Sequence, residues 1–239
     1  MRVFIVHAHH EQQSFNGAMT QEATNALAAA GHEVIVSDLY AMKFNPVSDR
    51  GNFVTVRDST YLRQQQEEIY AAENNGFASD IQREMDKLFW CDALIFQFPL
   101  WWFGLPAILK GWVDRVFAMR RIYGGGMYYD RGVFAGKRAM CSVTVGGQAT
   151  MYSEYGLNGP IPTILFPINH GILYFTGFTV IEPFIVHAPA RLTHEERKEQ
   201  LASYQQRVLQ LLTAPTLKFS RLADYDQDAV LKAELRTKT

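Results

Sequence analysis

The densest concentration of aromatic surface in this chain lies at residues 98–104, which read FPLWWFG. The stretch follows the unbroken apolar run at residues 93–96 and precedes a segment with helical spacing. A turn between a strand and a helix does not need so many large apolar side chains, whereas a planar ligand does. A flat binding wall would consist of Pro99, Leu100, Trp102 and Phe103. An aromatic cluster in the core or at a dimer interface is an equally weighted alternative.

A second candidate segment, residues 7–16, follows the apolar run at residues 3–6. It lacks both GxGxxG and GxxxxGK[ST], so neither phosphate-binding fingerprint is present. Ser14 and Asn16 can still donate hydrogen bonds, and a helix beginning after Ser14 offers free N–H groups to a phosphate. Taken alone, Ser14 is more simply a helix cap. His7 and His9 share one strand face but have no carboxylate or thiol partner, so we predict no metal site.

A third candidate segment, Gly146 and Gly147, follows the predicted strand that ends in Thr144 and Val145. Paired glycines let the backbone approach a ring closely, with N–H groups aimed at its polar edge. An ordinary tight turn is the alternative. All three segments fall at the carboxyl ends of predicted strands, where doubly wound sheets bind their ligands. Their convergence predicts a site for a planar cofactor that carries phosphate.

The elements that must position these segments alternate along the chain. Strands are predicted at residues 3–6, 33–39, 92–98, 138–145 and 180–186. Helices are predicted at residues 14–30, 58–72, 79–89, 106–117, 161–177 and 193–211. Ser14 and Ser79 are the predicted N-caps, Thr193 begins the last helix, and the helix at 161–177 is predicted to be buried. Apolar strands that alternate with helices predict an α/β fold, a doubly wound five-stranded parallel sheet with helices on both faces. The connection at residues 40–78 is too long for a plain crossover, so it is either an excursion over the active site or a dimer arm.

Composition excludes several classes of protein. The 239 residues suffice for one large domain, 48% of them are hydrophobic, and the net charge of -1 gives no electrostatic case for nucleic acid or an anionic membrane. Cys91 and Cys141 lie in or beside apolar runs without metal-ligand spacing, which predicts buried thiols in a reducing compartment. A strand begins directly after Met1-Arg2 and no apolar run is long enough to span a bilayer, so we expect a cytoplasmic protein.

The chain resembles the NAD(P)H:quinone oxidoreductase (DT-diaphorase) family of flavodoxin-like FAD enzymes almost from end to end. The resemblance rests on His9 with residues 14–16, on residues 37–42, 44–46, 96–100, 102–104, 106–112, 115–117, 146–147, 151–153, 171–173 and 177–178. It implies a flavodoxin-like FAD-binding catalytic domain at residues 1–214 and a short C-terminal tail at residues 215–239. It also implies a homodimer whose active site lies at the subunit interface.

The resemblance implies a role for each matching residue. The residues that would hold the FAD diphosphate and ribityl chain are His9, Ser14, Phe15, Asn16 and Ala18. The isoalloxazine would be held by Pro99, Leu100, Trp102 and Phe103, and its polar edge would contact Thr144, Val145, Gly146, Gly147 and Tyr152. Arg197 would lie at the adenine end. Substrate would stack near Trp102, Phe103, Gly147 and Met151. Tyr123, Tyr128 and Phe175 of a second subunit would close the pocket.

The implied reaction is the two-electron reduction of quinones by NAD(P)H or a related dihydronicotinamide, with ping-pong hydride transfer through the flavin N5. Tyr152 and Asn158 would be the catalytic residues at the flavin N1/O2 edge. The best-known family pattern has a histidine where this chain has Asn158, and an amide can donate a hydrogen bond but cannot carry a proton. Some members have Asn here, including a branch that prefers dihydronicotinamide riboside, so the donor stays open.

Two other functions stay open. A related flavin reductase could act on azo or nitro compounds, because an open apolar pocket accepts many planar acceptors. The chain could alternatively be a flavin-bearing regulatory subunit of a cation-efflux system or a one-electron carrier. Carriers of the flavodoxin kind are small and strongly acidic, and this chain is neither.

Overall fold

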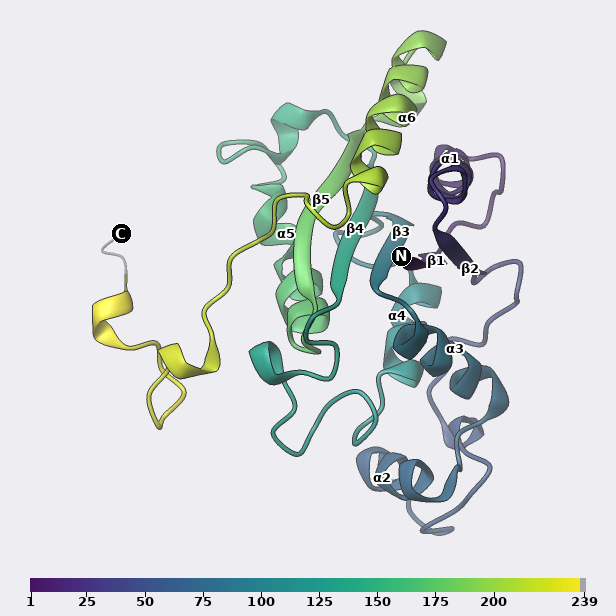
Figure 1. Ribbon diagram of the computed structural model, residues 1–239, viewed down its shortest axis with the longest axis vertical. Coiled ribbons are helices and arrows are strands. Elements are labelled where there is room, and N and C mark those ends of the chain that lie inside the picture. The colour runs from purple at the N-terminus through teal and green to yellow at the C-terminus, as the bar shows by residue number, and fades with distance from the viewer. Residues whose placement is uncertain (237–239) are drawn as a thin grey trace.

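The computed structural model describes residues 1–236, so the last three residues of the predicted tail lie outside the described part. The strands are β1 Arg2–His7, β2 Glu33–Asp38, β3 Ala93–Pro99, β4 Arg138–Val145 and β5 Thr179–His187. They form one parallel sheet in the order β2-β1-β3-β4-β5, which is the order of flavodoxin-like doubly wound sheets (Figure 1). The predicted fold class is confirmed.

Helices cover both faces of the sheet. The α-helices are α1 Phe15–Ala29, α2 Gln64–Asn74, α3 Ser79–Trp90, α4 Ala107–Val116, α5 Ile161–Ile168 and α6 His194–Leu209, and a π-helical turn, η4, spans Asn169–Tyr174. Short 3-10 turns occupy Arg50–Asn52, Tyr129–Arg131, Ala149–Tyr152, Pro189–Arg191, Leu222–Asp224 and Ala233–Leu235.

The strand side chains divide between two cores because successive residues point to opposite faces. In β1, Phe4 and Val6 pack in the core under α3, α4 and α5, whereas Val3 and Ile5 pack in the core under α1 and α6. Both faces are therefore buried, as the apolar strands require.

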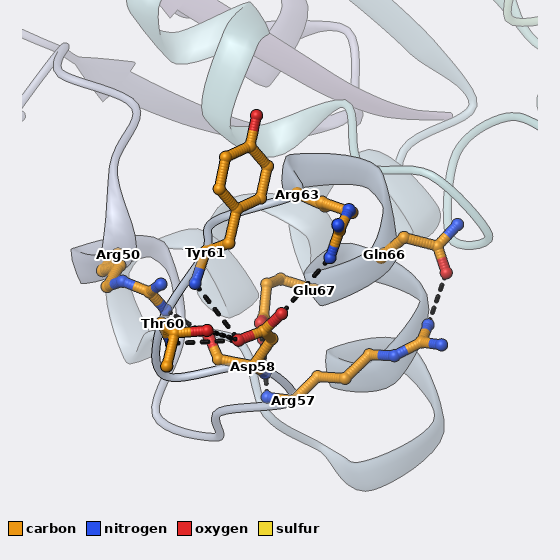
Figure 2. A network of polar contacts seen from close by, with 8 residues as sticks. All are labelled: Arg50, Arg57, Asp58, Thr60, Tyr61, Arg63, Gln66 and Glu67. Atoms are coloured by element: carbon orange, nitrogen blue, oxygen red, sulfur yellow. Dashed lines mark hydrogen bonds and ion pairs between the residues drawn. The ribbon is translucent and has the colours of Figure 1, made fainter.

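Two predicted helices have different bounds. The helix expected at residues 58–72 begins only at Gln64, because the Asp58 carboxylate accepts hydrogen bonds from the N–H groups of Thr60 and Tyr61 and folds this segment into a turn. Figure 2 shows this turn and the buried carboxylate of Glu67, which accepts from the backbone N–H groups of residues 57 and 58 at 2.8 Å each.

Residues 161–177 do not form one buried helix. α5 ends at Ile168 and continues as the π-helical turn, directly after Pro167, whose missing N–H breaks the α-helical ladder. Phe166 is half exposed. Ser79 was also misassigned as a cap: it is the first residue of α3, and Ala78 stands at the N-cap without a side-chain bond.

The start of the tail pairs with the first residues of β5 at its free edge. Glu182 donates its N–H to the Pro215 carbonyl at 3.0 Å, and Leu217 donates to the Val180 carbonyl at 2.8 Å. Pro183 is tolerated in this strand because it sits where the register with β4 is irregular. Figure 1 shows the tail leaving β5 and running away from α6.

Candidate functional site

The carboxyl ends of β1, β3 and β4 meet α1 and α6 around a cavity of about 640 Å³. Its lining contains eight of the predicted cofactor residues, namely His9, Ser14, Phe15, Asn16, Ala18, Pro99, Thr144 and Arg197. Residues that the sequence reasoning missed complete it, namely Gln13, Pro189, Ala190, His194, Lys198 and Leu201. The last three lie on α6, more than 180 residues after His9, and no local pattern places them here.

The N-terminus of α1 is built for an anion. The Ser14 side chain accepts from the Gly17 N–H at 3.1 Å, as the predicted cap should, and the first N–H groups of the helix keep no intrahelical partner. A Cβ on Gly17 would lie 1.9 Å from the Gln12 carbonyl oxygen, so the glycine lets the loop before α1 close over the helix end. Backbone donors and the helix dipole therefore face one cavity.

The charges around this cavity are basic. Arg197 and Lys198 line it, and none of its described lining residues is acidic. The Arg197 guanidinium donates from Nε to the Pro189 carbonyl at 3.0 Å, which ties α6 to the loop after β5. The cavity can therefore hold a ligand with negative charge.

The His9 ring is neutral and is hydrogen-bonded to the loop before α1. Burial lowers the pKa of His9, although the backbone bond to Glu11 acts in the opposite direction. Nδ1 lies 3.0 Å from the Glu11 backbone nitrogen and 3.1 Å from the Glu11 carbonyl oxygen, so the loop can hold either neutral tautomer. With the proton on Nε2, His9 can donate to a phosphate or hydroxyl oxygen, and with the proton on Nδ1 its Nε2 can accept from a hydroxyl.

The turn after β3 has an unusual backbone. Trp102 has φ 51° and Phe103 has φ 58°, and the turn is closed by the Gly104 N–H, which donates to the Trp101 carbonyl at 3.0 Å. Left-handed backbone is strained for bulky residues. Trp102 is 97% exposed, whereas Trp101 packs beside the rings of His9 and His10. The turn holds Trp102 out in solvent instead of burying it.

The loop after β4 places Gly147 against two other predicted residues. A Cβ on Gly147 would lie 3.0 Å from both the Met151 sulfur and the Tyr152 ring, so a larger residue here would have to push these side chains aside by a few tenths of an ångström. The Asn158 N–H donates to the Met151 carbonyl at 2.9 Å and folds the loop back on itself. His187, which sequence reasoning missed, ends β5 with its ring centroid 5.9 Å from that of Tyr152. Its only signal was its position at a strand end.

Tyr123, Tyr128 and Phe175 gather away from the first cavity. The rings of Tyr128 and Phe175 stack with centroids 6.2 Å apart, and Tyr123 lies 5.9 Å from Phe175. Tyr123 and Phe175 line a second cavity of about 540 Å³, with α2 and α4. None of the three lines the cavity around α1 in its own chain.

The remaining predictions concern thiols, metals and membranes. Both cysteines are free and buried, as expected, and burial raises the pKa of the Cys91 thiol to about 11. Within residues 1–236 no cluster of three potential metal ligands occurs. A search of the same residues finds no helix with the length and apolar character to cross a bilayer.

Comparison with known proteins places this arrangement in a family. The sequence profile of the family described as flavodoxin-like fold matches residues 1–212. NAD(P)H dehydrogenase (quinone) 1 of Cavia porcellus is 40% identical over 226 residues, which cover 94% of this chain and 82% of that protein. Human ribosyldihydronicotinamide dehydrogenase (quinone) is 42% identical over 208 residues, which cover 87% of this chain and 90% of that protein. A Klebsiella pneumoniae protein provisionally named a quinone reductase superimposes with a TM-score of 0.93 at 39% identity and covers 98% of this chain and 95% of its own.

Proposed function

This chain belongs to the flavodoxin-like family of NAD(P)H:quinone oxidoreductases, and on that premise we propose that it is an FAD-dependent quinone reductase. Its donor is a dihydronicotinamide and its acceptor a quinone, which occupy one site in turn in a ping-pong reaction. The chain is an oxidoreductase; the cofactor, the order of the reaction and the roles of individual residues are our proposal.

The cavity around α1 is the observation that carries the proposal. Its helix N-terminus, basic lining and lack of acidic side chains among the described residues suit the diphosphate of a dinucleotide. Its volume of about 640 Å³ is in the range of small-molecule and cofactor sites. His9, Ser14, Phe15, Asn16 and Ala18 would hold the diphosphate and ribityl chain, and Arg197 would lie at the adenine end.

The two neighbouring turns would hold the ring and the substrates. FAD would supply the redox chemistry, by accepting a hydride from the donor and passing it to the acceptor. Pro99, Leu100, Trp102 and Phe103 would form the wall of the ring site, with Thr144, Val145, Gly146 and Gly147 at its polar edge.

The proposed charge-stabilising pair is Tyr152 and Asn158. Tyr152 can donate its hydroxyl proton toward a developing negative charge, and Asn158 can donate from its amide. His187 beside Tyr152 adds an ionisable ring, and burial lowers the pKa of His187, so at neutral pH the ring is uncharged.

We also propose a homodimer. Tyr123, Tyr128 and Phe175 present stacked, partly exposed rings that their own α1 cavity does not use. In a two-fold dimer the same patch of each subunit can cover the substrate site of the other.

The test is a spectrum followed by kinetics. The purified protein should be yellow and should release FAD on denaturation. A dihydronicotinamide should bleach it in stopped-flow mixing, and a quinone should restore the colour. A colourless protein that cannot be reconstituted with FAD would refute the proposal. Bleaching by dihydronicotinamide riboside but by neither NADH nor NADPH would assign the donor.

A further inference from the structure

Four buried polar side chains form a hydrogen-bonded network. It runs from α6 along the face of the sheet under α1 to the cavity around α1. The Tyr204 hydroxyl donates to Gln97 Oε1 at 3.1 Å, Gln97 Nε2 donates to Asn16 Oδ1 at 2.9 Å, and Asn16 Nδ2 donates to Thr144 Oγ1 at 2.8 Å. Tyr204 and Gln97 are fully buried, and the other two are at most 5% exposed. Only Asn16 and Thr144 line the cavity.

In this hydrogen-bonded network, each side chain donates to the next in one direction, from Tyr204 to Thr144. An amide side chain has its acceptor at one end and its donors at the other, so the orientation of Gln97 dictates that of Asn16. The Met19 sulfur lies 3.8 Å from Gln97 Nε2 and would face a carbonyl oxygen if the amide were reversed. Burial raises the pKa of Tyr204, which keeps its hydroxyl protonated, and the otherwise unpartnered Ser142 hydroxyl lies beside it.

This direction of donation leaves the hydroxyl hydrogen of Thr144 free at the cavity. Thr144 Oγ1 already accepts from Asn16, so its own O–H is left to donate. We propose that Thr144 is an obligatory donor to an acceptor atom of the bound flavin nucleotide, and that Tyr204 and Gln97 are positioning residues that enforce this role from outside the cavity. The inference rests on the proposed function.

The first test compares two substitutions of Thr144. Thr144→Val keeps the shape but removes the donor, and we expect roughly five- to tenfold weaker FAD binding to the apoprotein. Thr144→Ser keeps the hydroxyl and should bind within about twofold of the unaltered protein. Fluorescence quenching of FAD measures the affinity, and thermal unfolding of each apoprotein shows that the fold is retained.

The second test isolates the remote residue. Tyr204→Phe removes the first donor of the network without changing a residue of the cavity. We expect roughly threefold weaker FAD binding, because the Gln97 amide can then rotate by 180° and the direction of donation toward Thr144 is no longer fixed. In the Thr144→Val background the same substitution should have no further effect on affinity, since it acts through Thr144. Tyr174→Phe is the matched control. It removes a hydrogen bond of 2.9 Å from the Tyr174 hydroxyl to the Ser220 carbonyl, which is not part of this network, and should leave FAD affinity unchanged.

The third test reverses the polarity. Asn16→Asp offers only acceptors, so it captures the Thr144 proton and should weaken FAD binding at least tenfold. Unchanged FAD binding in Asn16→Asp would mean that the hydrogen bonds of the network run in the opposite direction. Unchanged FAD binding in Thr144→Val would mean that the Thr144 hydroxyl makes no hydrogen bond to FAD. Either result overturns this inference alone. If the unaltered apoprotein does not bind FAD, the proposed function fails with it.

Discussion

Trp102 shows most clearly how a single residue of this chain is placed against its own backbone preference. Its φ of 51° costs about 1–2 kcal/mol, and at 97% exposure it recovers no burial in the isolated subunit. Strain of this kind persists where function uses it. The two aromatic residues of the turn are therefore better explained as parts of a preformed binding wall than as members of the core.

We predict that Trp102→Gly leaves the apoprotein as stable as before or up to about 1 kcal/mol more stable, because glycine adopts this backbone without strain while losing more entropy on folding. Tyr155→Gly is the control: this tyrosine is 92% exposed without a positive φ, and its loss should cost about 0.5–1 kcal/mol. Urea titration measures both. The KM for quinone should rise in the Trp102 variant. A clear loss of stability there would show that the strain is absent.

His7 predicts how stability depends on pH. Burial lowers the pKa of His7, partly opposed by Asp38. The unfolded chain therefore binds more protons than the folded one below about pH 6.5, and the free energy of unfolding falls as the pH drops through this range. His7→Gln removes one such group, so its stability should fall less steeply between pH 7.5 and roughly pH 5 than that of the unaltered protein. Parallel slopes in urea titrations at several pH values would contradict the prediction.

At the scale of elements, the buried carboxylate of Glu67 ties residues 57 and 58 to α2. Glu67 is 2% exposed and accepts two backbone N–H groups from the segment before α2. Figure 2 shows this carboxylate beside the Asp58 turn, where hydrogen bonds from Thr60 lower the pKa of Asp58 to about 2. The Arg57 side chain also donates to Gln66 from the same segment.

We predict that Glu67→Gln costs about 1–3 kcal/mol, because the amide accepts only one of the two bonds and turns its NH₂ toward the other donor. Glu73→Gln in the same helix is exposed and should change stability by less than about 0.5 kcal/mol. Hydrogen exchange should be faster at the amides of residues 57 and 58 in the first variant alone. Unchanged hydrogen exchange at these two amides would show that other contacts hold residues 57 and 58 in place.

Local chemistry decided which elements could be predicted. Ser14 caps its helix as predicted, and Thr193, predicted to begin the last helix, is its N-cap, because each helix start depends on a few adjacent residues. The start of α2 was missed because the Asp58 turn competes with the helix, and the helix after residue 160 was predicted too long because the break at Pro167 was ignored. Gln97 was a visible anomaly in an apolar strand, but its partner Tyr204 is 107 positions away and only the folded chain joins them.

At the scale of the whole molecule, one chain holds two halves of the proposed active site that do not meet. The cofactor cavity and the Trp102 turn form one half. The cluster of Tyr123, Tyr128 and Phe175 forms the other, and its Tyr123 and Phe175 line a different cavity. The topology that brought eight predicted cofactor residues together left these aromatic residues apart, which is what a shared site between two subunits requires.

Subunit mixing tests this arrangement. Trp102→Ala should weaken the cofactor half and Phe175→Ala the closing half, so each homodimer should have low quinone reductase activity. In a mixed dimer with the halves contributed by different subunits, one site carries both substitutions and the other carries neither. After exchange of equal amounts, about half of the dimers are mixed, each with one intact site, and we expect about a quarter of the unaltered activity. If Phe175 instead serves the site of its own chain, every site keeps one defect, and mixing gives only the average of the two weak activities.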